Sequence, residues 1–179
     1  LKKSNPLFFK SFKKILSYLS HRGPDSNGIY KKNNVQLIHT RLSIVDINGG
    51  SQPIKNEDLV LVANGEVYND LTIRSKIKKY RYKTKSDSES ILAVYKEYGL
   101  DGFKKLRGMF SFAIHDEKKK VTIIGRDLFG IKPLYFSLVD EGIIFSSEIQ
   151  SIKKINLQKL NISENQLLEF FQLQYCSGR

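Results

Sequence analysis

The sequence is poor in cysteine, and its single one, Cys176, excludes an internal disulfide and a metal site built on several cysteines. No apolar run is long enough to span a bilayer. Lysines interrupt the start of the chain, where a signal peptide would carry an unbroken apolar block. We therefore expect a cytoplasmic protein that does not bind a membrane.

Acidic residues are also scarce, since 18 aspartates and glutamates stand against 30 lysines and arginines and leave a net charge of +12. An excess of this size raises nucleic-acid binding as one interpretation. Only 7 of the basic residues are arginines, however, and the lysines are scattered instead of forming a stripe with interleaved aromatic residues. We expect no nucleic-acid partner.

The chain has 179 residues, 40% of them hydrophobic, which suffices for one globular domain with its own core. Alternating and continuous apolar runs predict strands, and polar turns join several of them into hairpins. Strands separated by a few helices favour an α+β fold. The expected strands cover 28–30, 35–40, 59–63, 110–115, 121–125, 134–139 and 142–146, and the expected helices cover 4–20, 71–79, 86–98 and a last one capped by Ser163 with Gln166.

The run 59–63 is continuously aliphatic, which predicts a strand buried on both faces. We expect this strand to end at Asn64 and Gly65, a rigid place for a site. Ser86 and Glu89 have the spacing of a capping box, in which the two side chains bond to backbone N–H groups at a helix start. In that arrangement the side chain of Asp87, between them, is not needed for the cap and can point away from the helix.

Three polar runs hold the groups that would grip one amino acid and polarise its side-chain amide. Arg41 offers a guanidinium for an α-carboxylate, although most arginines are surface residues. Asp87 offers a carboxylate for an α-ammonium, although an aspartate in the first turn of a helix needs no ligand. The Asn64 amide and the Gly65 N–H would form an oxyanion hole, although Asn-Gly is also a common turn. Together these groups indicate glutamine.

The histidines His21, His39 and His115 match neither a catalytic triad nor a metal-ligand spacing. A histidine without a nearby nucleophile is usually a hydrogen-bonded or surface residue. We therefore expect structural roles for all three, and no metal site.

Seven motifs carry a family resemblance, and they lie in one order at 21–26, 40–46, 64–69, 86–89, 107–113, 125–135 and 146–149. Chance does not supply all of them in register. The chain resembles the glutaminase domain of glutamine-hydrolysing asparagine synthetases, which are type 2 amidotransferases with an amino-terminal nucleophile. The resemblance implies an Ntn-hydrolase-like four-layer αββα sandwich of two antiparallel sheets, here lacking its first strand. It also implies a domain over 1–155, then a helix and the start of a connection to a synthetase domain over 156–179.

The family hydrolyses glutamine to glutamate and ammonia and passes the ammonia to a synthetase domain, which converts aspartate to asparagine with ATP and magnesium. The resemblance therefore implies glutamine as substrate, the synthetase domain as partner, a homodimer as an option, and no cofactor in this chain. The oxyanion hole would be Asn64 and Gly65, and the substrate-binding residues would be Arg41, Leu42, Ser43, Ile44, Val45, Asn64, Gly65, Glu66 and Asp87.

Family members carry the catalytic cysteine as the first residue of the mature chain, whereas this sequence opens at Leu1. Cys176, near the other end, is no substitute, so we expect the chain alone to be inactive. Three interpretations stay open: a fragment, a non-catalytic glutamine-binding or assembly paralogue, and an amidotransferase acting on another acceptor. A sheet without an inner strand would also make the isolated chain marginally stable and prone to aggregate.

Overall fold

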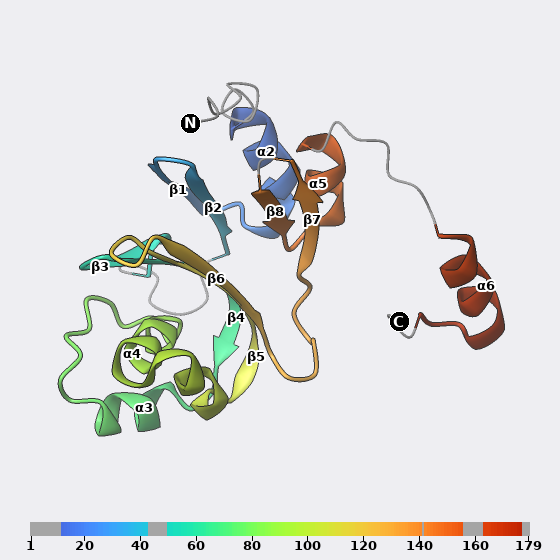
Figure 1. The fold of residues 1–179 in the computed structure, drawn as a ribbon. Coiled ribbons are helices and arrows are strands. Elements are labelled where there is room, and N and C mark those ends of the chain that lie inside the picture. Colours follow the sequence, from blue (N-terminus) through green and yellow to red (C-terminus); the bar gives the residue numbers. More distant parts are fainter. Residues whose placement is uncertain (1–11, 43–49, 141, 156–162, 177–179) are drawn as a thin grey trace.

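The computed structural model describes residues 12–42, 50–140, 142–155 and 163–176. Two runs of four antiparallel strands are separated by helices along this part of the chain, as Figure 1 shows, and the expected α+β class is confirmed. The helical elements are α2 (Phe12–Leu19), η1 (Ser20–Arg22), α3 (Asp70–Lys76), α4 (Glu89–Tyr98), η2 (Gly99–Lys105), α5 (Ile149–Ile155) and α6 (Glu164–Leu173). The strands are β1 (Ser26–Lys32), β2 (Val35–Arg41), β3 (Ile54–Asn56), β4 (Leu59–Val67), β5 (Gly108–Asp116), β6 (Val121–Arg126), β7 (Tyr135–Val139) and β8 (Gly142–Ser146).

The chain folds into four layers, which are a pair of helices, a four-stranded sheet, two separate two-stranded ladders and a second pair of helices. Strands β3, β4, β5 and β6 form a four-stranded antiparallel sheet, with α3 and α4 on one face (Figure 1). The β1–β2 and β7–β8 ladders lie beyond the opposite face, and α2 and α5 cover them in turn (Figure 1). The second layer differs from the single sheet expected, because no strand among the described residues bridges its two ladders.

Strand β4 is buried on both faces at Leu59–Ala63, as predicted. Successive side chains of a strand point to opposite faces. Leu61 accordingly belongs to the core shared with α3 and α4, and Val60 and Val62 pack against Leu37 of β2. This one strand therefore joins the two halves of the core and holds whatever follows it in a fixed position.

Helix α4 begins at Glu89, and the predicted capping box is wrong. The residue at its start, Ser88, makes no side-chain cap hydrogen bond. The Glu89 side chain is fully buried and bonds to the segment before the helix instead. By contrast, the expected cap of the last helix is confirmed, because the Ser163 side chain accepts a hydrogen bond from the Gln166 N–H at 3.4 Å. The start expected at Ser4 lies outside the described residues.

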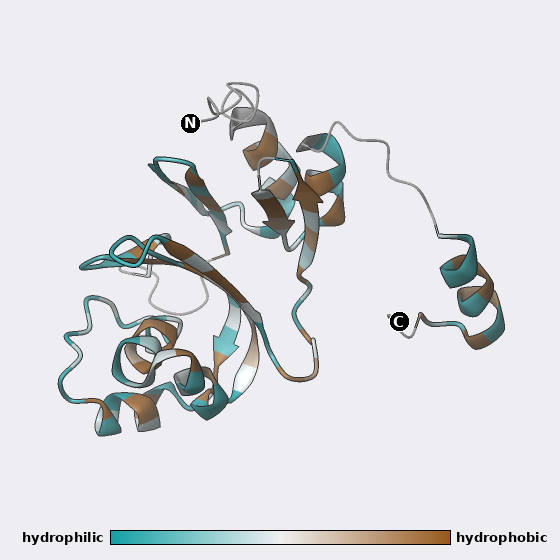
Figure 2. Cartoon of the chain, in the orientation of Figure 1, coloured by the Kyte–Doolittle hydropathy of each residue, from teal (hydrophilic) through white to brown (hydrophobic). Residues whose placement is uncertain are grey.

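Two elements present apolar surface to solvent. Strand β7 exposes Phe136 and Leu138, and the hydrophobic colouring of β7 and β8 is plain in Figure 2. Helix α6 stands apart from the layers (Figure 1), with Leu168 and Phe171 largely exposed. No helix in the described part of the chain is long and apolar enough to cross a membrane.

Candidate functional site

In the described part of the chain, the second half of strand β4 has an edge that side chains cap instead of a neighbouring strand. Strand β3 pairs with β4 only at Leu59–Leu61. Further along, the Ala63 N–H donates to Gln52 Oε1 at 2.6 Å, and Gln52 Nε2 donates to the Ala63 carbonyl at 3.1 Å. The Val67 N–H donates to Asp87 Oδ2 at 2.6 Å. Among the described residues, the backbone is thus bonded on either side of a short open stretch, which has no partner on this edge.

Gly65 occupies that open stretch. Backbone N–H groups two residues apart point to the same edge of a strand, so the Gly65 N–H lies on the edge that Ala63 and Val67 use. Its φ of +133° belongs to a region that favours glycine, and a Cβ would lie 2.0 Å from the Met109 carbonyl oxygen. No other residue fits here without moving strand β5.

Asn64 lies within strand β4, so the expectation that the strand ends there is wrong. Pairing with β5 continues as far as Val67, opposite Gly108, and this also rules out the tight-turn alternative for Asn64 and Gly65. Asn64 shares its face of β4 with Val60 and Val62, which pack toward β2. The partly buried Asn64 amide is therefore placed on the side of the sheet that faces β2.

Arg41 is the last residue of β2 and is only 7% exposed, which argues against an ordinary surface arginine. Leu37, His39 and Arg41 share one face of β2. Leu37 packs on β4, and His39 Nε2 lies 3.0 Å from the Ala63 carbonyl. The same face at Arg41 is directed toward the stretch of β4 that follows Ala63. The Asp25 N–H, from the motif at 21–26, donates to the Arg41 carbonyl at 3.0 Å and fixes its backbone.

His39 supports this arrangement in its neutral form. Burial lowers the pKa of His39 to about 4, with a smaller contribution from the Arg41 charge, although the bond to the Ala63 carbonyl acts in the opposite direction. A carbonyl oxygen only accepts, so Nε2 carries the proton. His115 Nδ1 lies 3.1 Å from Thr122 Oγ1, and His21 lies 3.7 Å from Glu148, as expected for structural histidines.

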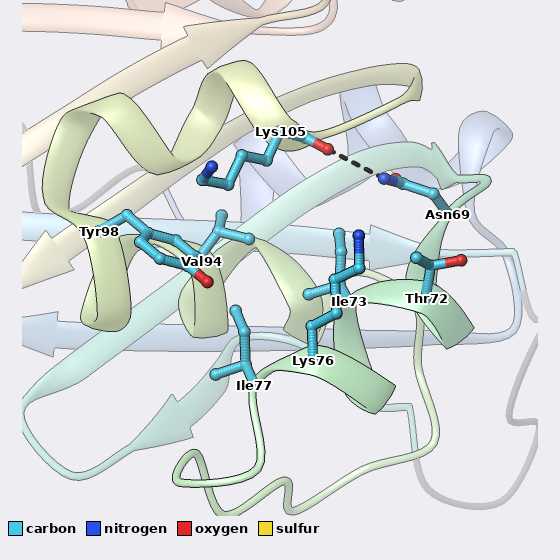
Figure 3. Close-up of a pocket in the computed structure, with 8 residues that line it drawn as sticks. All are labelled: Asn69, Thr72, Ile73, Lys76, Ile77, Val94, Tyr98 and Lys105. Atoms are coloured by element: carbon cyan, nitrogen blue, oxygen red, sulfur yellow. Dashed lines mark hydrogen bonds between the residues drawn. The ribbon is translucent and has the colours of Figure 1, made fainter.

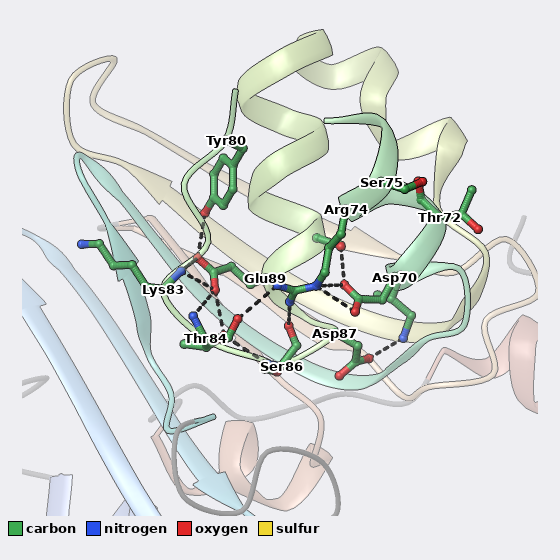
Figure 4. A network of polar contacts seen from close by, with 12 residues as sticks. Asp70, Thr72, Arg74, Ser75, Tyr80, Lys83, Thr84, Ser86, Asp87 and Glu89 are labelled. Carbon is green, nitrogen blue, oxygen red and sulfur yellow. Dashed lines mark hydrogen bonds and ion pairs between the residues drawn. The ribbon is translucent and has the colours of Figure 1, made fainter. Parts of the chain in front are cut away.

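Asp87 lies two residues before α4, and its partly buried carboxylate turns to strand β4 instead of its own helix. The segment that carries it is held by Glu89 and by Arg74, whose guanidinium donates to the Ser86 carbonyl at 2.7 Å (Figure 4). Asp87 is thus fixed to the same strand that carries Asn64 and Gly65.

The remaining predicted binding residues are less defined. Leu42 follows β2 and is 56% exposed, and Glu66 is exposed on β4. Ser43, Ile44 and Val45 lie outside the described residues, so their role stays a prediction. Sequence reasoning missed Gln52, because nothing in its neighbourhood indicates that it pairs with a backbone 11 residues away.

A pocket of about 160 Å³ lies elsewhere, between α3, α4 and η2 (Figure 3). None of the predicted site residues lines it, and Figure 3 shows aliphatic side chains and Tyr98 together with Asn69, Thr72 and two lysines. Among the described residues, no group of three or more histidine, cysteine, aspartate and glutamate side chains could hold a metal ion. The candidate site is therefore the open edge of β4. The pocket lining is Asn69, Thr72, Ile73, Lys76, Ile77, Val94, Tyr98 and Lys105.

Comparisons with known proteins agree with the motifs. The glutamine amidotransferase domain model matches residues 2–178. Asparagine synthetase B [glutamine-hydrolyzing] of Escherichia coli is 44% identical over 138 residues, which are 75% of this chain and 25% of that protein. Asparagine synthetase [glutamine-hydrolyzing] 1 of Bacillus subtilis is 36% identical over 91% of this chain and 26% of that protein. The chain thus spans about a quarter of the length of these relatives.

Solved structures agree on the fold alone. A glutamine phosphoribosylpyrophosphate amidotransferase from Bacillus subtilis has a TM-score of 0.56 at 20% identity, covering 67% of this chain and 29% of that one. The fold is therefore that of the Ntn-hydrolase amidotransferases. The chain belongs to the glutamine amidotransferase domain family, and its sequence places it with the glutaminase domains of glutamine-hydrolysing asparagine synthetases.

Proposed function

We propose that this chain binds L-glutamine and supports its hydrolysis to glutamate and ammonia within an asparagine synthetase. The observation that carries this proposal is the open edge of β4, where the Gly65 N–H lies between two N–H groups that Gln52 and Asp87 already occupy. A donor fixed in a strand and left to a ligand is suited to charge that develops during a reaction.

Each end of glutamine has a matching group beside this edge. The Arg41 guanidinium takes the α-carboxylate through two parallel hydrogen bonds. Asp87 takes the α-ammonium through the carboxylate oxygen that Val67 leaves available. The side-chain amide oxygen then meets the Asn64 amide and the Gly65 N–H, which stabilise the negative charge of the tetrahedral intermediate.

These residues hold and polarise glutamine, and none of them attacks it. The single cysteine, Cys176, follows α6 and is exposed, with Sγ 3.6 Å from the Gln166 carbonyl. In the family the attacking thiolate belongs to an amino-terminal cysteine, whose own α-amino group takes the thiol proton. The sulfur bonds to the amide carbon, the proton passes to the amide nitrogen, and the carbon–nitrogen bond breaks as ammonia leaves. Water then cleaves the thioester and releases glutamate.

The ammonia would be used by a synthetase domain that joins it to aspartate with ATP and magnesium. The relatives' names and lengths support this part of the proposal, because the chain spans about a quarter of each. A homodimer stays a prediction.

Glutamate and ammonia release by the full-length protein tests the proposal. Asn64→Ala is expected to lower turnover about 100- to 1,000-fold, as for other lost oxyanion donors. Asn165→Ala, on the exposed surface of α6, is the matched control and should leave turnover unchanged.

Other outcomes separate the alternatives. Glutamine binding without hydrolysis would indicate a non-catalytic binding module. Hydrolysis without aspartate-dependent consumption of ATP would indicate another acceptor. Full turnover by Asn64→Ala would contradict the assigned oxyanion hole.

A further inference from the structure

The Glu89 carboxylate is fully buried, and its hydrogen bonds go to neutral groups in the described part of the chain. It accepts from the backbone N–H of Lys83 at 2.9 Å and of Thr84 at 2.7 Å, and from Thr84 Oγ1 at 2.8 Å. Asn56 Nδ2 donates to it at 3.1 Å. The Tyr80 hydroxyl donates to it at 3.2 Å (Figure 4). A buried carboxylate is costly, so its use on loop backbone calls for a reason beyond packing.

Arg74 holds the same segment from the other side. Its guanidinium donates to the carbonyl of Thr84 at 3.1 Å and of Ser86 at 2.7 Å. Asp70 accepts from Arg74 Nε at 2.8 Å, and the guanidinium lies 4.0 Å from the centre of the Tyr82 ring. Figure 4 shows the two charged side chains meeting the segment from α3 and α4. The backbone of Thr84 is thus held by the Glu89 carboxylate at its N–H and by the Arg74 guanidinium at its carbonyl.

The segment so clamped leads directly into Asp87. Ser86 is buried, and its carbonyl bonds both to Arg74 and to the Glu89 N–H. Asp87 then reaches the Val67 N–H on strand β4. The oppositely charged side chains of Glu89 and Arg74 thus each fix the backbone of this segment. The first side chain beyond that backbone is the proposed ligand for the α-ammonium.

We propose that Glu89 and Arg74 are positioning residues that aim the Asp87 carboxylate at the substrate's α-ammonium, and so set the preference for an α-amino acid. This inference rests on the proposed function. Neither residue touches substrate in this account. Loosening either one lets the 83–86 segment shift, and Asp87 then loses its alignment with Gly65 and Asn64 while Arg41 keeps its position.

The test compares two ligands in the full-length protein by titration calorimetry. Glutamine carries the α-ammonium, and glutaramate is the same molecule with hydrogen in its place. Wild type should prefer glutamine about 10- to 100-fold, the range expected for a hydrogen bond to a charged group. Asp87→Asn should abolish most of that preference. Glu89→Gln and Arg74→Lys should each lower it about three- to tenfold, while glutaramate binding changes little.

The matched control is Glu117→Gln, which removes another well-shielded carboxylate, bonded to the side chains of Tyr30 and Lys55. The 83–86 segment meets Lys55 at its backbone carbonyl, through Lys83 Nζ at 3.1 Å, and this bond does not involve the Glu117 carboxylate. Glu117→Gln should lower stability without changing the preference, because loosening the fold weakens both ligands alike. Arg74 is 21% exposed, so Arg74→Lys keeps the test decisive if Glu89→Gln does not fold.

The outcomes distinguish the two proposals. Absence of glutamine binding by wild type, or an unchanged preference in Asp87→Asn, would overturn the proposed function itself. A different result would overturn this inference alone. In that case Asp87→Asn loses the preference for glutamine over glutaramate, whereas Glu89→Gln and Arg74→Lys both keep a preference within twofold of wild type.

Discussion

Replacing Asp87 by asparagine separates its two roles. An asparagine Oδ1 can still accept from the Val67 N–H, which the carboxylate now meets at 2.6 Å, so the anchor to strand β4 survives as a weaker neutral hydrogen bond. The stability cost should be about 0.5–1.5 kcal/mol, or a fall of about 2–5 °C in melting temperature. The charge that the α-ammonium needs is lost altogether.

Losing a hydrogen bond to a charged group costs about 1.5–3 kcal/mol, so glutamine should bind about 10- to 150-fold more weakly. Titration calorimetry and scanning calorimetry on the same samples measure both effects. Asp87→Ala is a less clean variant, because it also leaves the Val67 N–H without its acceptor. A glutamine dissociation constant within twofold of wild type in Asp87→Asn would refute the assignment.

Three further predictions concern the surroundings of the site. Hydrogen bonds from Lys32 and Lys55 lower the pKa of Glu117 to about 2. The Glu117 carboxylate therefore stabilises the fold at pH values above its unfolded pKa, and this stabilisation is lost as pH falls from about 4.5 to 2. Because both lysines are half exposed, this contribution should be about 1 kcal/mol. The melting temperature should depend less on pH across that range in Glu117→Gln than in wild type. Identical dependence in the two proteins would contradict this prediction. The His39 ring, with its pKa lowered to about 4, should keep unchanged NMR signals from pH 8 to about 5, and titration near 6.5 would show that it is not buried as described. Gly65→Ala places a Cβ 2.0 Å from the Met109 carbonyl and should destabilise the fold by about 2–4 kcal/mol in denaturant titrations, whereas an unchanged midpoint would mean that strand β5 yields freely.

Regular features were predictable because they depend on local pattern. The continuous aliphatic run predicted the two-sided burial of β4, and the polar turn between 116 and 120 predicted the β5–β6 hairpin. The Ser163 cap was also predicted correctly, since a capping hydrogen bond spans only a few residues.

The errors arose where distant segments decide the outcome. Asn64 and Gly65 have the composition of a turn, yet pairing with β5 keeps them within a strand. Glu89 has the spacing of a cap, yet the segment at 83–84 turns its N–H groups inward and captures the carboxylate. The Gln52 side-chain amide bonds to the backbone of Ala63 as a neighbouring strand would. The two residues are 11 positions apart, and no local pattern reveals this contact.

The candidate site was therefore predictable as a set of chemical groups, but its support was not. The sequence supplied Arg41, Asn64, Gly65 and Asp87 as matching groups for an amino acid. Only the fold shows that Gln52, Arg74 and Glu89 hold the backbone around them.

The central claim is that glutamine binds along the open edge of β4 in one orientation. A crystal structure of the full-length protein with glutamine tests this most directly. The account predicts the α-carboxylate on Arg41, the α-ammonium on Asp87, and the side-chain amide oxygen about 3 Å from the Gly65 nitrogen and the Asn64 amide nitrogen. Glutamine bound in the opposite orientation, or in the pocket between α3, α4 and η2, would contradict it.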